Sequence, residues 1–421
     1  SGRADEAVGE LAGRYRRFLG QHPDAELADI CYTAGVGREH FERRAAMIVQ
    51  SREHAERLLG QLEQAGNPTG LYRGAARGKP KVAWQFTGQG SQYVGMAREL
   101  YDSQGVFRDV LDRCDQSLRQ WRGKSLLDVM FGDEEELNQT TWTQPALFSL
   151  QIGLAELYKS WGIKPDVVLG HSVGQFAAAC VAGTIGWKDG LRLISERSRL
   201  TGSLPSGGAM AAVFAPEAKV EDVLRSYSNL SIAAMNGSHI VISGSEQTLL
   251  AALKTFAEAD VRCKRLATSH AFHSALMDPI MDQWQQIADS IDFRRAEIPI
   301  ICNVSGKLID ADKVFDGAYW GQHLRQPVQF ANSVSALAEF GCDVVVELGP
   351  QPILTTMAAG CWPGTRPALL ASLHQQQNDS ESILHSLAQL YVLGTTPDFA
   401  ALNNESGCQR IELPTYPFQR K

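Results

Sequence analysis

The sequence contains no run of 18 uninterrupted apolar residues, so no segment is predicted to span a membrane. Its first residues, Ser1 to Asp5, include no initiator Met and no apolar signal region. We therefore expect a cytoplasmic piece of a longer polypeptide. With 421 residues, the chain is too long for one small hydrophobic core and is predicted to form two or three packed units.

Cysteine is sparse, and no two of the eight cysteines have the CxxC spacing of a metal or redox motif. Scattered cysteines are typical of free thiols in a cytosolic protein, so a structural zinc site is not expected. The net charge of −7 argues against a general nucleic-acid binder, although a local basic patch for phosphates is compatible with it.

Strand and helix patterns alternate from residue 81 onward, and they include a long apolar helix predicted for Pro145 to Trp161. This alternation predicts a parallel sheet covered on both faces. Residues 205–267 instead follow the order βαββαβ, which is typical of a ferredoxin-like unit. The predicted fold is therefore α/β: a hydrolase-like parallel-sheet domain with an inserted ferredoxin-like subdomain, preceded by a small α/β domain. The predicted units are residues 1–80, 81–204 with 268–371, 205–267, and 372–421.

A GxSxG motif spans residues 170–174, with Ser172 at its centre. An apolar strand predicted for 166–170 precedes it, and an Ala-rich helix predicted for 172–182 follows. A tight turn between such a strand and helix exposes the serine, and the two glycines give it room. The start of the helix also directs N–H groups toward a developing oxyanion. The context favours a nucleophile at Ser172 over a structural Gly-Ser turn.

A serine nucleophile needs a base, and the His-Ala-Phe-His segment from His270 to His273 supplies candidates. This segment follows the inserted subdomain directly, and such a junction is a natural place for a cleft. The alternatives are a pair of capping or surface histidines, or a metal site, which no acidic third ligand nearby supports. His171 adjoins Ser172 and is expected to point off the turn.

The segment Gly88-Gln89-Gly90 lies between a predicted strand and a predicted helix. Tyr93 stands where a dinucleotide-binding motif has its third glycine, and the P-loop ending is absent too. Cofactor binding is therefore not predicted here. Glycine permits close backbone approach to a ligand, so a main-chain N–H donor for an oxyanion is the favoured interpretation.

Together these motifs resemble the acyltransferase domains of modular type I polyketide synthases, relatives of malonyl-CoA:acyl-carrier-protein transacylase. The resemblance covers the whole chain. Residues 1–80 resemble the linker between a ketosynthase and its acyltransferase, and the extended segment Leu413 to Arg420 resembles the strap that returns to that linker. Further matching stretches are Phe86–Gln92, Thr143–Phe148, Tyr319–Trp320, His323–Leu324, Pro327–Phe330 and Val346–Pro350.

The resemblance implies a role for each of several residues. Ser172 resembles the nucleophile and His273 its base. A main-chain carbonyl, in the region of Gln329, would orient the histidine in place of a carboxylate. The main-chain N–H groups of Gln89 and Val173 resemble the oxyanion hole.

The resemblance also implies residues that bind the substrate. Arg197 matches the arginine that holds the substrate's free carboxylate, and its planar fork of donors suits that group. The alternative is a surface helix arginine like its neighbours Arg192 and Arg199. Gln144 is expected to line the pocket.

His270 and Phe272 belong to the family's signature for the extender unit. The pattern here is the malonyl type, whereas the methylmalonyl type has Tyr-Ala-Ser-His. The bulk of Phe272 favours malonyl, but one methyl group is worth only about 1–3 kcal/mol in a pocket. Gln175 departs from the family, which commonly has Glu there.

The resemblance therefore implies ping-pong transfer of a malonyl group from malonyl-CoA to an acyl carrier protein. The carrier protein supplies the phosphopantetheine thiol, and no bound cofactor or metal is expected. An adjacent ketosynthase in the same polypeptide is the other expected partner, with no nucleic acid or membrane. The rival interpretations are a GxSxG esterase or thioesterase, which predicts an Asp or Glu beside the histidine, and a catalytically silent scaffold domain.

Overall fold

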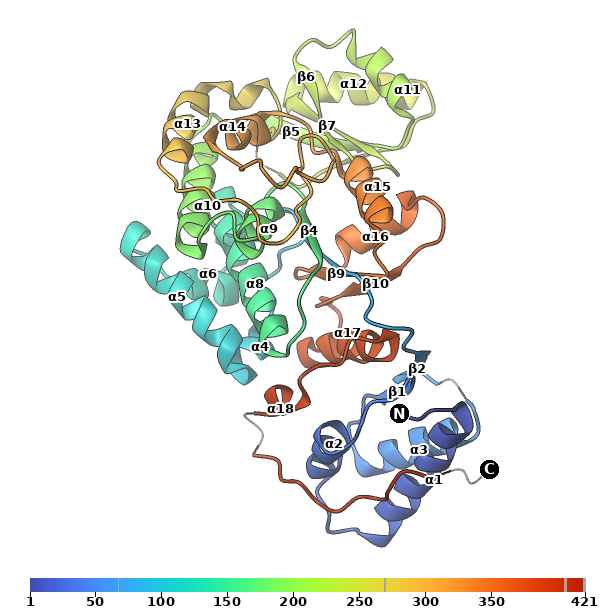
Figure 1. Cartoon of the computed structure of the whole chain (residues 1–421). Coiled ribbons are helices and arrows are strands. Elements are labelled where there is room, and N and C mark those ends of the chain that lie inside the picture. Colours follow the sequence, from blue (N-terminus) through green and yellow to red (C-terminus); the bar gives the residue numbers. More distant parts are fainter. Residues whose placement is uncertain (67, 269, 405–406, 419–421) are drawn as a thin grey trace.

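A four-stranded parallel sheet forms the centre of the largest part of the computed structural model (Figure 1). Strand β3 (Val82–Phe86) is buried along its whole length and pairs with β4 (Val167–Gly170) and β9 (Val344–Leu348). Strand β10 (Ala368–Ala371) completes the order β10-β9-β3-β4. Such continuous apolar runs are typical of strands covered on both faces. The structure describes every residue except 67, 269, 405–406 and 419–421.

Helix α8 (Thr140–Ser160) is the longest helix against this sheet. It begins five residues before Pro145, where the sequence predicted its start. Proline deprives the carbonyl four residues earlier of its helical partner. Here that carbonyl belongs to Thr141, and it accepts hydrogen bonds from the Arg122 and Ser198 side chains, so α8 continues through Pro145.

Other helices surround the sheet and the site. They are α4 (Arg98–Ser103), α5 (Gly105–Arg122), α6 (Leu126–Gly132), α7 (Glu134–Leu137), α9 (Gly174–Val181), α10 (Trp187–Gly202), a 3₁₀ helix (Ala275–Ile280), α13 (Met281–Asp289), α14 (Gly317–Arg325), α15 (Phe330–Phe340) and α16 (Ile353–Cys361).

A second, antiparallel sheet lies above the core in Figure 1 and has the strand order β6-β7-β5-β8. With two helices on it, this is the predicted ferredoxin-like unit, and the predicted α/β fold class is confirmed. Val328 joins this sheet to the main domain, because its N–H and C=O bond Ala233 O and Met235 N at 2.9 Å each. The unit comprises β5 (Gly208–Val213), α11 (Glu217–Leu224), β6 (Leu230–Met235), β7 (Ile240–Ser245), α12 (Glu246–Glu258) and β8 (Cys263–Arg265).

The N-terminal domain packs three helices against the antiparallel strand pair β1–β2, and the tail helix α17 lies between this pair and the core (Figure 1). The extended C-terminal segment returns to this domain: Arg38 donates to Leu413 O at 2.8 Å, and Leu413 is buried in the domain's core. Gln419 and Arg420, the end of the predicted strap, lie outside the described residues. The elements are α1 (Asp5–Gln21), α2 (Leu27–Val36), β1 (Arg43–Met47), α3 (Arg52–Glu63), β2 (Leu71–Ala75), α17 (Asp379–Leu393) and α18 (Phe399–Leu402).

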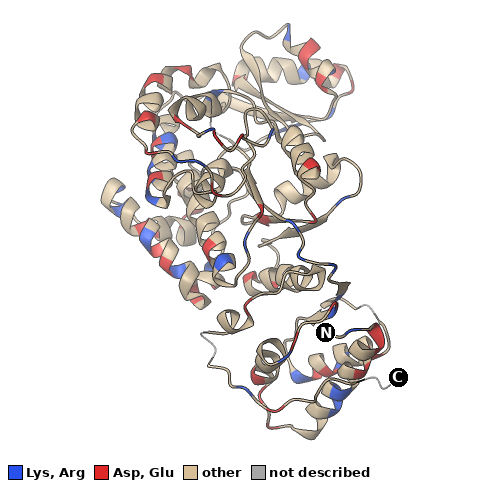
Figure 2. Cartoon of the chain, in the orientation of Figure 1, with Lys and Arg blue, Asp and Glu red and all other residues tan. Residues whose placement is uncertain are grey.

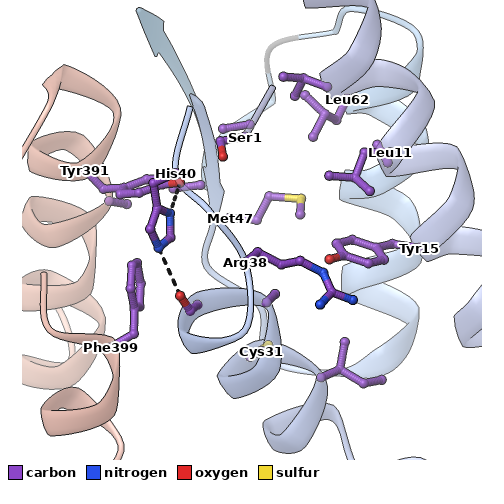
Figure 3. A pocket seen from close by; sticks show the side chains of 18 of the residues that line it. Ser1, Leu11, Tyr15, Cys31, Arg38, His40, Met47, Leu62, Tyr391 and Phe399 are labelled. Carbon is purple, nitrogen blue, oxygen red and sulfur yellow. Dashed lines mark hydrogen bonds between the residues drawn. The ribbon is translucent and has the colours of Figure 1, made fainter. Parts of the chain in front are cut away.

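A cavity of about 960 Å³ lies between the N-terminal helices and α17 (Figure 3). Its walls are mostly apolar. His40 lies in one wall, where hydrogen bonds connect its ring to Tyr391 Oη at 2.8 Å and to Gly35 O at 3.0 Å. All of its lining residues come from 1–62 and 384–418. The cavity is therefore separate from the GxSxG turn and its surroundings.

Charged side chains follow the solvent-facing helices. Figure 2 shows Lys and Arg interspersed with Asp and Glu along outer helices such as α5, while the central strands carry few charges. Within the described residues, no helix is both long and apolar enough to cross a membrane.

Candidate active site

A sharp turn joins the end of β4 to the start of α9 and carries Ser172. The predicted helix start at Ser172 is wrong by two residues, because Ser172 has a left-handed φ of +49° and α9 begins at Gly174. A Cβ on Gly174 would lie 2.0 Å from Phe86 O, and one on Gly170 would lie 2.2 Å from Gln175 N. Glycine is therefore required on both sides of the serine.

Ser172 and His273 form a hydrogen-bonded pair. Ser172 Oγ lies 2.8 Å from His273 Nε2, and His273 Nδ1 lies 2.9 Å from the main-chain oxygen of Gln326. A carbonyl only accepts, so Nδ1 carries the proton and Nε2 is left to accept the serine proton. His273 also has a left-handed φ, +55°. A thioesterase-like site would instead place a carboxylate on Nδ1.

The carbonyl that orients His273 lies in the predicted region but belongs to Gln326, not to Gln329 itself. The Gln329 carbonyl accepts from Ser333 N at 2.9 Å in the first turn of α15, so it points into that helix. Gln326, three residues earlier, precedes the extended turn into α15 and leaves its oxygen directed at His273. Gln329 still lies close to the site, because its N–H donates to Asn303 O at 2.8 Å.

Burial lowers the pKa of His273 to about 3, and the nearby positive charge of Arg197 acts in the same direction. The imidazole is therefore neutral near pH 7, which is the form that accepts a proton. Its side chain is almost completely enclosed, with the residue 3 % exposed.

The main-chain N–H groups predicted to form the oxyanion hole belong to Gln89 and Val173. Val173 follows the serine directly, and Gln89 follows Gly88, where an added Cβ would lie 2.9 Å from His171 O. Within the described residues, neither of these N–H groups donates a hydrogen bond to another part of the chain. Val173 directly precedes α9, whose N-terminus adds positive potential at this point. The arrangement can therefore accommodate an oxygen that gains negative charge.

Arg197, on α10, is 1 % exposed and has no acidic partner among the described residues. Its Nη1 donates to Gln144 Oε1 at 2.7 Å, while Nε and Nη2 have no hydrogen-bond partner in the described structure. Burial lowers its pKa to about 10. The surface-arginine alternative is wrong, because Arg197 points inward and offers two adjacent donors that fit one carboxylate.

The other predicted residues surround this arginine. The ring centroid of Phe272 lies 5.7 Å from Arg197 Cζ, and Gln144 Nε2 lies 3.4 Å from Gln89 Oε1. Gln144 thus links the arginine to the loop that carries Gln89. His270 is half-buried beside Phe272, with ring centroids 6.1 Å apart.

His171 contacts the ferredoxin-like unit. Its Nε2 lies 3.0 Å from Asn236 Oδ1, at the turn between β6 and β7. The contact attaches the turn that carries Ser172 to the ferredoxin-like unit. Within the described residues, no group of three His, Cys, Asp or Glu side chains is arranged to hold a metal ion.

Two residues of the site were missed by sequence reasoning: Asn303 and Gln326. Asn303 Oδ1 accepts from Ser172 N at 2.7 Å. Gln326 contributes a main-chain oxygen, which no side-chain pattern can reveal. His323 is buried near His273, with ring centroids 6.1 Å apart, and burial lowers its pKa well below the usual value.

Comparisons with known proteins agree with this geometry. Residues 83–397 match a family described as the acyl transferase domain, and residues 1–59 match one described as CurL-like, PKS C-terminal. The chain is 36 % identical to polyketide synthase GfsB of Streptomyces halstedii, over 429 residues. It is 37 % identical, over 425 residues, to the phenolphthiocerol synthesis polyketide synthase type I Pks15/1 of Mycobacterium marinum. Both matches cover 100 % of this chain but only 8 % and 20 % of those relatives.

Solved structures show the same similarity. The acyltransferase domain from the second module of the salinomycin polyketide synthase superposes with a TM-score of 0.84 at 34 % identity. That match covers 99 % of this chain and 98 % of the other. The malonyl CoA-acyl carrier protein transacylase of Clostridium perfringens gives a TM-score of 0.68 at 26 % identity, covering 74 % of this chain and 99 % of the other.

Proposed function

The chain belongs to the acyl transferase domain family, and from this premise we propose that it moves a malonyl group from malonyl-CoA to the phosphopantetheine thiol of an acyl carrier protein. The observation that carries the proposal is the contact of 2.8 Å between Ser172 Oγ and a neutral His273. Beside this pair lies a buried arginine with two donors that have no hydrogen-bond partner in the described part of the chain. These features supply a nucleophile, a base and a carboxylate site in one place.

In the first half-reaction, Ser172 Oγ attacks the thioester carbonyl of malonyl-CoA while His273 Nε2 takes the serine proton. The carbonyl oxygen becomes an oxyanion that accepts from the N–H groups of Gln89 and Val173. The carbon–sulfur bond then breaks, and the coenzyme A sulfur leaves with the proton from His273. The product is a malonyl ester on Ser172.

In the second half-reaction, the phosphopantetheine thiol of the carrier protein attacks this ester. His273 takes the thiol proton and returns it to Ser172 Oγ as the carbon–oxygen bond breaks. The Gln326 carbonyl stabilises the imidazolium formed in each half-reaction, because it accepts from Nδ1 throughout. Arg197 holds the malonyl carboxylate by Nε and Nη2 in both steps, so the acyl group keeps one orientation.

The choice of malonyl over methylmalonyl rests on Phe272, which is 7 % exposed and lies against Arg197. A methyl group on the carbon next to the bound carboxylate must share this space with the phenyl ring. Competition among malonyl-, methylmalonyl- and acetyl-CoA for loading tests the choice. We expect malonyl to be loaded preferentially, and equal loading of methylmalonyl would refute it.

The carrier protein and a ketosynthase in the same polypeptide are the proposed partners. The proposal of these partners is supported by the length of the related synthases, because the chain spans only 8 % of one and 20 % of another.

The acyl-enzyme can be tested by incubating the protein with malonyl-CoA and digesting it for mass spectrometry. We expect one malonyl group on the peptide that contains Ser172 and none on the Ser172→Ala variant. A malonyl group found elsewhere, or none at all under conditions where transfer proceeds, would contradict the mechanism.

A further inference from the structure

Two buried amide side chains, those of Asn303 and Gln175, make polar contacts with the main chain of the Ser172 turn. Asn303 Oδ1 accepts from Ser172 N at 2.7 Å, and Asn303 Nδ2 donates to Gly170 O. Gln175 Oε1 accepts from Gly170 N at 3.0 Å. The left-handed φ of Ser172 is unfavourable for a residue with a side chain and persists only where its surroundings impose it. These contacts help to impose it.

The two amides also bind one another. Asn303 Nδ2 donates to Gln175 Oε1 at 3.1 Å, and Gln175 Nε2 donates to Ile301 O at 3.0 Å. Gln175 is therefore attached both to the Asn303 side chain and to the main chain two residues before it. A fully ionised carboxylate at this position would have no proton to donate to Ile301 O. The departure from the family's Glu thus supplies a neutral anchor for Asn303.

The main chain that precedes Asn303 runs beside β4, the strand that ends two residues before Ser172. Val168 N donates to Pro299 O and Ile301 N donates to Val168 O, both at 2.9 Å, in a parallel arrangement. Parallel segments end at the same edge of a sheet. Asn303 therefore emerges next to the Ser172 turn, on a segment distant in sequence.

The same residue reaches the histidine side of the pair through its main chain. Asn303 O accepts from Gln329 N at 2.8 Å. Gln329 lies three residues after Gln326, whose carbonyl fixes His273 at 2.9 Å. Asn303 thus contacts the nucleophile's turn by its side chain and the histidine's orienting segment by its main chain.

We propose that Asn303 is a positioning residue that keeps Ser172 and His273 in the relative position that their hydrogen bond requires, with Gln175 as its anchor. It touches no reacting atom, since its partners are main-chain groups and one amide. The proposal rests on Ser172 being the nucleophile, as proposed above. Misplacement of a reacting atom by about 1 Å can cost about 10²-fold in rate, so loss of these contacts should slow attack without weakening substrate binding.

The test uses the whole chain and a fluorophosphonate probe, which reacts with activated serines and needs no malonyl site. Asn303→Asp keeps the oxygen that accepts from Ser172 N but loses both donations, so labelling of Ser172 should slow at least about tenfold. For malonyl transfer, kcat should fall similarly while the KM for malonyl-CoA stays within about twofold, because Arg197 is untouched. Asn303→Ser tests the same loss without a buried charge, should Asn303→Asp fail to fold.

The matched control is Asn332→Asp, since Asn332 is an exposed α15 residue that bonds only the Gln329 side chain among the described residues. It should label at the wild-type rate. Wild-type labelling rates in folded Asn303→Asp or Asn303→Ser would overturn the positioning role, as would a raised KM with labelling unchanged. If the wild-type chain itself is not labelled at Ser172, the nucleophile assignment fails and this proposal fails with it.

Discussion

Replacing Arg197 by Met should separate malonyl from acetyl transfer. The guanidinium is buried without an acidic partner among the described residues, and burial lowers its pKa from the usual range of arginine to about 10. That difference corresponds to about 3 kcal/mol of unfavourable burial of the charged form. A bound malonyl carboxylate accepts from Nε and Nη2 and offsets this cost, whereas an acetyl group does not. Methionine has similar length, no charge and no donors.

We therefore expect Arg197→Met to lower kcat/KM for malonyl-CoA by about 10²-fold, which is the rate equivalent of about 3 kcal/mol. The kcat/KM for acetyl-CoA should change by less than about threefold. The melting temperature should shift by only a few degrees, because removal of an unpaired buried charge offsets the about 1–3 kcal/mol lost when Gln144 Oε1 loses its donor.

The assay measures initial rates of transfer from each acyl-CoA to a carrier protein, together with a thermal melt. Arg199→Met is the control, because Arg199 lies on the same helix but is exposed and paired with Glu196 at 2.7 Å. It should leave both rates unchanged. Equal losses for malonyl and acetyl in Arg197→Met would refute a carboxylate role and leave only a structural one.

Two further predictions concern the pair and its turn. Because burial and the Arg197 charge lower the pKa of His273 to about 3, the histidine stays neutral as pH falls through 6.5, and kcat/KM should stay flat from pH 8 to about 5. A pH-rate profile with a tenfold loss by pH 5.5 would show an ordinary histidine instead. Gly174→Ala should lower the free energy of unfolding by about 3 kcal/mol or more, since its Cβ would lie 2.0 Å from Phe86 O. In urea unfolding, Gly132→Ala, with no atom within 4 Å of the added Cβ, should leave the midpoint almost unchanged.

The fold class was predictable because its signals are local. Buried strands of the parallel sheet read as apolar runs, and the βαββαβ order of the inserted unit follows from alternating strand and helix patterns. Boundaries were less predictable where the tertiary structure overrides them. Pro145 suggested a helix start, but the helix begins earlier. The Arg122 and Ser198 side chains donate hydrogen bonds to the Thr141 carbonyl, which Pro145 leaves without a helical partner.

The residues of the site were likewise predictable only in part. Ser172, His273 and Arg197 carry their chemistry in side chains within recognisable segments, and the structure brings them together. The carbonyl that orients His273 belongs to the main chain of Gln326, so residue type contains no information about it. Asn303 lies 131 residues after Ser172, and only the parallel run of residues 299–301 beside β4 brings it there.

The most direct test of the account is a chase of the isolated acyl-enzyme. The protein is first loaded with labelled malonyl-CoA, freed of coenzyme A, and mixed with a carrier protein that bears phosphopantetheine. We predict that the label leaves Ser172 and appears on the carrier thiol much faster than it appears as free malonate. Release mainly as malonate, at the same rate with or without the carrier protein, would identify a hydrolase and contradict the proposed transfer.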